Sequence, residues 1–185
     1  MTDYQHIIVD SPLEGVSRIT LNRPDSRNAL NNIIRGEIYG TLEANDNDDA
    51  VRVTIIRGAG QAFCAGYDLK GNSNEDRPFH TAGGDGSWAR HVVEGAFRVW
   101  DLAKPVIAQV HGYCLAGGTE LATSCDLVYV AEDAKIGYPV VRSMSPPDNQ
   151  FFPWVVGMRN AMEMMLTGDA ISGTDAANYG FANRA

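Results

Sequence analysis

Two glycine-rich stretches decide how this chain folds: AFCAGYDLK at residues 62–70 and HGYCLAGGTEL at residues 111–121. Each stretch follows a short β-branched run and leads into an expected helix start. The first turn of a helix leaves its backbone N–H groups without acceptors, so these groups can point at a ligand. Two such turns aimed at one oxygen would form an oxyanion hole, which stabilises negative charge on a carbonyl oxygen.

Outward from these stretches, apolar runs of strand character alternate with runs of helical period. We expect strands over residues 6–9, 16–21, 51–56, 106–110 and 126–131. We expect helices over residues 29–44, 88–103, 120–124, 150–165 and 172–179. Residues 71–87 are polar and rich in glycine without any period, which predicts a surface loop or lid. The alternation predicts an α/β fold with right-handed crossovers.

Length and composition point to one domain. The chain has 185 residues and a net charge of 15 − 23 = −8, which argues against broad binding to nucleic acid or membranes. No run of eighteen apolar residues exists to span a membrane. The three cysteines show no metal spacing, and a reducing cytoplasm is the simplest interpretation. No phosphate-binding loop, dinucleotide fingerprint or metal cluster is visible, so we expect neither a metal nor a resident cofactor.

Four segments, taken in order, resemble the crotonase superfamily, also called the enoyl-CoA hydratase/isomerase superfamily. They are the two glycine-rich stretches, NRPDSRNALN at residues 22–31 and AMEMMLTG at residues 161–168. The resemblance implies a crotonase-like spiral of repeated β-β-α units, with residues 1–185 as an acyl-CoA-binding core. Family members usually continue into a C-terminal helical segment that covers the site and supports trimers. We expect that segment to be absent after Ala185, and a homo-trimer or dimer of trimers as the assembly.

The same resemblance assigns roles within the two stretches. Tyr67 and Gly117 would supply the two N–H groups of the oxyanion hole, and Glu120 occupies one of the family's two catalytic glutamate positions. Glu120 lies three residues after Gly117, so one helical turn brings it to the same side. A carboxylate there could act as general base or acid. The alternative is a glutamate favoured by the positive end of the helix dipole.

A CoA thioester would be the substrate, and its binding path follows from the resemblance. Because the chain is acidic overall, contacts to the CoA phosphates must be local. Arg27 could make such a contact, or it could be a solvated surface charge. The residues predicted to bind substrate or CoA are Arg27, Ala29, Ala65, Gly66, Asp68, Leu69, Leu115, Gly118, Pro139 and Val140.

One departure from the family pattern bears on the chemistry. The second family glutamate normally follows a proline, and Val140 stands at that position here, after Pro139. Hydration by two glutamates is therefore less favoured. Asp148 could compensate, because some dienoyl-CoA isomerases and the 4-chlorobenzoyl-CoA dehalogenase carry a catalytic aspartate in about this turn. It would shuttle a proton in the first case and act as nucleophile in the second. The alternative is an ordinary helix N-cap.

Three hypotheses follow. The leading one is an acyl-CoA enzyme of the enoyl-CoA hydratase/isomerase type, in which the two backbone amides hold the thioester oxygen and Glu120 moves a proton. A dehalogenase-like member using Asp148 is a variant of it. The second is an acyl-CoA-binding or assembly module without catalysis. The third is a fragment that folds poorly and associates through an uncovered face.

Overall fold

The computed structural model describes residues 3–70, 87–143 and 149–185, with the backbone alone for residues 87–92. It contains a five-stranded sheet in the order β1-β2-β3-β5-β7 and a four-stranded sheet in the order β4-β6-β8-β9. The strands of the first sheet are Ile7–Leu13, Val16–Leu21, Val53–Gly58, Val106–Val110 and Leu127–Val130. Those of the second sheet are Ala62–Cys64, Tyr113–Leu115, Lys135–Gly137 and Ala170–Ser172.

From β3 onward the chain repeats one unit. Each unit contributes a strand to the large sheet, a strand to the small sheet and then helical structure: β3-β4-α2, β5-β6-α3, and β7-β8 followed by η3, α4 and α5. Strands of successive units pair in parallel in both sheets. The expected spiral of β-β-α units is therefore confirmed. Between the strands of the described residues, β1 with β2 and β8 with β9 pair in antiparallel fashion.

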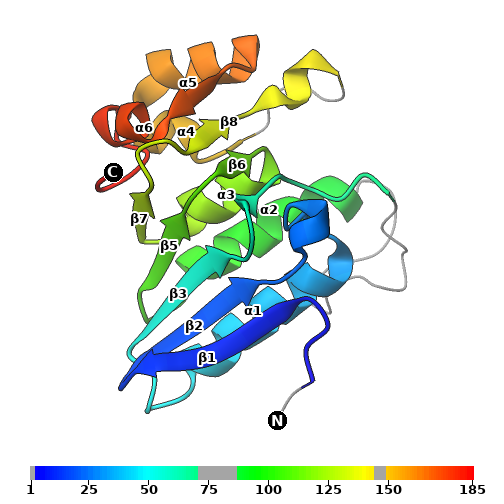
Figure 1. Ribbon diagram of the computed structural model, residues 1–185, viewed down its shortest axis with the longest axis vertical. Coiled ribbons are helices and arrows are strands. Elements are labelled where there is room, and N and C mark those ends of the chain that lie inside the picture. The colour runs from blue at the N-terminus through cyan, green and yellow to red at the C-terminus, as the bar shows by residue number, and fades with distance from the viewer. Residues whose placement is uncertain (1–2, 71–86, 144–148) are drawn as a thin grey trace.

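The helices lie on one side of the large sheet and at one end of the molecule. Figure 1 shows α1, α2 and α3 behind the strands and α4, α5 and α6 above them, around β8. The helical segments are η1 Pro24–Ser26, α1 Asn32–Asp46, α2 Ser87–Trp100, α3 Gly117–Ser124, η3 Pro139–Arg142, α4 Phe152–Val155, α5 Gly157–Thr167 and α6 Gly173–Tyr179. Helix α1 begins where the side chain of Asn31 accepts from the Ile34 amide, a standard N-cap.

Two sequence expectations need correction. The short strands β4, β6, β8 and β9 were not expected, because three residues are too few for an alternating pattern to register. The helix expected over residues 150–165 is two helices, because Gly157 adopts φ = +76° and breaks the helical path between α4 and α5. Within residues 3–70, 87–143 and 149–185, no helix is long and apolar enough to cross a membrane.

Candidate active site

The two glycine-rich turns lie side by side. Strands β4 and β6 are parallel neighbours, so the turns that follow them leave the small sheet at the same edge. At Gly66, where φ is +107°, an added Cβ would lie 2.9 Å from the Cβ of Ala116 and 3.4 Å from the amide nitrogen of Gly117. Glycine is required here both by the backbone conformation and by the close approach of the second turn.

Helix α3 begins at Gly117, immediately after a strained residue. Ala116 has φ = 49° and ψ = −121°, a conformation that usually needs glycine. Its carbonyl oxygen accepts from the amides of Thr119 at 2.8 Å and Glu120 at 3.2 Å. The helix itself offers no acceptor to the Gly117 amide, which belongs to its first turn. Strain of this kind costs about 1–3 kcal/mol and is concentrated at functional sites.

The backbone of Tyr67 is oriented by a short parallel bridge to Leu30. The Leu30 amide donates to Gly66 O at 2.8 Å, and the Asp68 amide donates to Leu30 O at 3.0 Å. Because peptide groups alternate along extended chain, the N–H of Tyr67 points away from Leu30. Its ring lies over Gly117, since a Cβ added there would be 2.6 Å from Cε2 of Tyr67.

The carboxylate of Glu120 is buried between two tyrosine hydroxyls. Glu120 is 2% exposed. Its Oε2 accepts from the hydroxyl of Tyr67 at 2.5 Å, and its Oε1 accepts from the hydroxyl of Tyr138 at 2.9 Å. Hydrogen bonds from two hydroxyls offset part of the cost of burying the carboxylate. From the sequence we predicted Glu120 as a catalytic residue, but not its hydrogen bonds with the hydroxyls of Tyr67 and Tyr138.

A buried arginine completes this group. Arg35, on α1, is 1% exposed, and its guanidinium carbon lies 5.3 Å from the centre of the Tyr67 ring. That geometry is a cation–π contact, which gains strength when it is desolvated. The signal in the sequence is an arginine between Ile34 and Ile38, on the side of α1 that faces the core.

Burial controls the protonation of the groups around this carboxylate. Burial, followed by the negative charge of Glu120, raises the pKa of the Tyr67 phenol well above its usual value, although Arg35 opposes the rise. Tyr67 therefore keeps its proton at neutral pH. Burial also raises the pKa of the nearby Cys64 thiol to about 12, so this thiol is not a reactive thiolate.

The remaining predicted residues separate into two groups. Asp68 pairs with Arg23 at 2.8 Å, and Gly118 packs so tightly that an added Cβ would lie 3.0 Å from the carbonyl carbon of Cys64. These two have contacts within the protein that explain them. The others are more accessible: Arg27 and Leu69 are exposed, and Ala29, Ala65, Leu115, Pro139 and Val140 are partly buried.

Two of the sequence predictions concern residues that the structure does not describe. Asp148 lies outside the described residues, and so do residues 71–86 of the predicted lid. Val140 lies on η3, two residues after Tyr138, and packs against the core with a partly buried side chain. Among the described residues, no group of three histidine, cysteine, aspartate or glutamate side chains could hold a metal ion.

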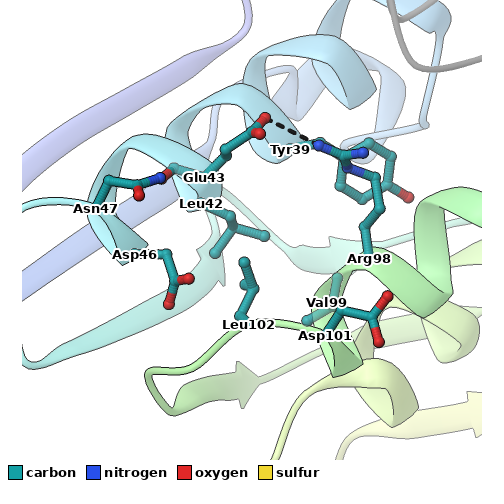
Figure 2. A pocket seen from close by; sticks show the side chains of 9 residues that line it. All are labelled: Tyr39, Leu42, Glu43, Asp46, Asn47, Arg98, Val99, Asp101 and Leu102. Carbon is teal, nitrogen blue, oxygen red and sulfur yellow. Dashed lines mark hydrogen bonds and ion pairs between the residues drawn. The ribbon is translucent and has the colours of Figure 1, made fainter.

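Two surface cavities lie away from the Glu120 group. One, of about 260 Å³, lies between α1 and α2; Figure 2 shows its charged lining, where Arg98 pairs with Glu43. The other, of about 470 Å³, lies at the carboxyl ends of β3, β5 and β7 and includes Arg57 and His111. Neither cavity is lined by Glu120 or Gly117.

Comparison with known proteins decides the family. Residues 12–185 match the model of the enoyl-CoA hydratase/isomerase family. The chain belongs to this family. A mevalonyl-coenzyme A hydratase of Aspergillus fumigatus is 33% identical over 183 residues, covering 97% of this chain and 66% of the relative. A mitochondrial enoyl-CoA hydratase of Pongo abelii is 35% identical over 176 residues, covering 91% of this chain and 57% of the relative.

Solved structures of family members agree with the fold. The crystal structure of an enoyl-CoA hydratase from Mycobacterium smegmatis matches with a TM-score of 0.85 at 32% identity, covering 99% of this chain and 66% of the other. An enoyl-CoA hydratase/isomerase from Xanthobacter autotrophicus matches with a TM-score of 0.83 at 38% identity, covering 98% and 67%. This chain thus spans about two thirds of the length of these two family members.

Proposed function

We propose that this chain carries the catalytic core of an acyl-CoA thioester enzyme. The backbone amides of Tyr67 and Gly117 would hold the thioester oxygen, and Glu120 would transfer a proton. Two fixed donors stabilise the charge that develops on this oxygen, and loss of one donor typically costs about 3–4 kcal/mol. Family membership supports the thioester substrate.

One observation carries the proposal. A buried carboxylate, that of Glu120, lies one helical turn from Gly117 and accepts a hydrogen bond from the hydroxyl of Tyr67, whose ring lies over Gly117. All residues of α3 are buried, so Glu120 is enclosed together with the start of the helix, whose positive end favours a negative charge there. Its burial beside the turns that carry the Tyr67 and Gly117 amides suits proton transfer in a site shielded from water.

The predicted CoA path and the assembly belong to the same proposal. Arg27 is exposed beside the turns, with its guanidinium carbon 5.5 Å from the Tyr113 ring, where it could meet a CoA phosphate. A homo-trimer, or dimer of trimers, has support from large apolar side chains exposed along α4 and α5: Trp154, Met158, Met162 and Leu166. A cytoplasmic location has support from three buried cysteines without disulfides.

Crotonyl-CoA tests the proposal directly. The chain is incubated with it, and loss of the conjugated enoyl thioester is followed by absorbance while thioester binding is followed by calorimetry. Glu120→Gln should lower the rate at least 100-fold, the range for loss of a general acid or base, and leave binding nearly intact. Glu163→Gln, at an exposed site on α5, is the matched control. Equal rates in Glu120→Gln and the wild type would refute the role of Glu120.

A second candidate function is an acyl-CoA-binding or assembly module without catalysis. It is favoured by Val140, which places an apolar side chain where the family's second glutamate stands. This candidate predicts saturable binding of CoA thioesters with no turnover and no exchange of substrate protons. Failure to bind any CoA compound would exclude both functions.

A further inference from the structure

The side chain of Tyr67 offers a proton-transfer group that the family pattern does not assign. With valine at position 140, a second acid beside Glu120 must come from another residue. Two hydroxyls contact the Glu120 carboxylate, those of Tyr67 at 2.5 Å and Tyr138 at 2.9 Å. Either could exchange a proton with Glu120, so their surroundings decide which one could also reach a substrate.

Tyr138 is fixed within the core. It is 3% exposed, and its ring packs edge-on against Phe152 with the ring centres 6.1 Å apart. Its hydroxyl therefore holds Glu120 from the protein interior. A group that is enclosed in this way can position the carboxylate but has no open side for a substrate carbon.

Tyr67 bonds to the other carboxylate oxygen, Oε2, and belongs to the first glycine-rich turn itself. Tyr67 is only partly buried. Its ring lies over Gly117, and its backbone amide points away from Leu30. A carbonyl oxygen held by the amides of Tyr67 and Gly117 would place the adjoining α-carbon against this ring and near its hydroxyl. The same residue would thus contact both the oxygen and the α-carbon of the thioester.

Resting on the function proposed above, we propose that Tyr67 is the second proton-transfer group of the site, giving a proton to the α-carbon and recovering it from Glu120. In a hydration, Glu120 takes a proton from water, and the water oxygen bonds to the β-carbon. The electron pair of the double bond moves to form the enolate. The enolate α-carbon then takes the Tyr67 proton, and the Glu120 carboxyl returns its proton to the phenolate along their hydrogen bond.

The atoms and protons of this relay balance, since one water is added to the substrate and the side chains of Glu120 and Tyr67 return to their starting protonation states. Burial and the charge of Glu120 raise the pKa of the Tyr67 phenol, so the proton is present when the enolate forms. An enolate carbon is a stronger base than a phenolate, which makes the transfer favourable. The Arg35 guanidinium, 5.3 Å from the ring centre, would stabilise the transient phenolate.

Exchange of α-protons tests the relay without requiring knowledge of the overall reaction. Butyryl-CoA is incubated with the protein in D₂O, and deuterium at its α-carbon is measured by mass spectrometry. Tyr67→Phe keeps the ring and the backbone amide but removes the hydroxyl, so exchange should fall at least 100-fold while calorimetric butyryl-CoA binding is retained. Tyr138→Phe, the matched control, removes the other hydroxyl from Glu120 and should lower exchange less than tenfold.

A check of folding and one further variant complete the test of the relay. Thermal melting establishes that each variant is folded. Tyr67→His restores an exchangeable proton on a planar ring and should exchange at least tenfold faster than Tyr67→Phe. Equal losses in Tyr67→Phe and Tyr138→Phe, or no recovery in Tyr67→His, would overturn the relay and leave the proposed function standing. A wild-type chain that neither binds nor exchanges butyryl-CoA would overturn the proposed function itself.

Discussion

Gly118→Ala should disturb the contact that holds the two turns together. An alanine Cβ at this position would lie 3.0 Å from both the carbonyl carbon and the Cβ of Cys64, and closer still to the carbonyl oxygen. Carbon atoms in ordinary contact are about 3.5–4.0 Å apart, so α3 and the end of β4 must separate by roughly 0.5–1 Å. The obstacle is mainly backbone, and no rotamer change can remove it.

Two magnitudes follow from this displacement. Overpacking a tight interior site costs about 1–3 kcal/mol, which for a chain of this size lowers Tm by roughly 2–12 °C. A shift of about 1 Å in a positioned donor can lower a catalytic rate about 100-fold. We therefore expect a lower Tm in thermal melting and a rate of α-proton exchange from butyryl-CoA that is about 100-fold lower.

Gly36→Ala is the matched control, because it is also a helical glycine and an added Cβ there meets nothing within 4 Å. It should raise stability by about 0.5–1 kcal/mol through helix propensity alone. If Gly118→Ala melted within 1 °C of the wild type and exchanged at the wild-type rate, the inferred close packing of the two turns would be wrong.

Two further predictions concern titratable groups. Burial opposes ionisation of Asp68, but the Lys70 amide and Arg23 outweigh it and lower the pKa of Asp68 below 3.8. The stability that ionised Asp68 contributes is therefore present above pH 3.8 and is lost as the pH falls through the lower folded-state pKa. In urea titrations, Asp68→Asn should lose less stability between pH 5 and pH 3 than the wild type does. Cys64, whose pKa burial raises to about 12, and the buried Cys114 and Cys125 should resist a thiol reagent in the native chain and react in urea. Rapid native labelling would contradict their burial.

The sequence predicted the long elements because their signals are local. The β-branched runs of β3 and β5 and the period of α1 are properties of neighbouring residues, and the structure has strands and a helix at these places within a few residues. The strand β4 was missed, because a three-residue strand exists only through its pairing with β6. The split at Gly157 was also missed, because its positive φ is not encoded in any periodic pattern.

By itself, the sequence determined the α/β class, the family likeness and the positions of the two glycine-rich turns, because tight turns require particular residues at particular places. Only the tertiary structure decided what surrounds Glu120. The hydroxyls of Tyr67 and Tyr138 come from segments 53 residues before it and 18 residues after it, and Arg35 comes from α1. Contacts over such separations depend on how helices and sheets pack, and burial, which sets the protonation of Tyr67, follows from that packing alone.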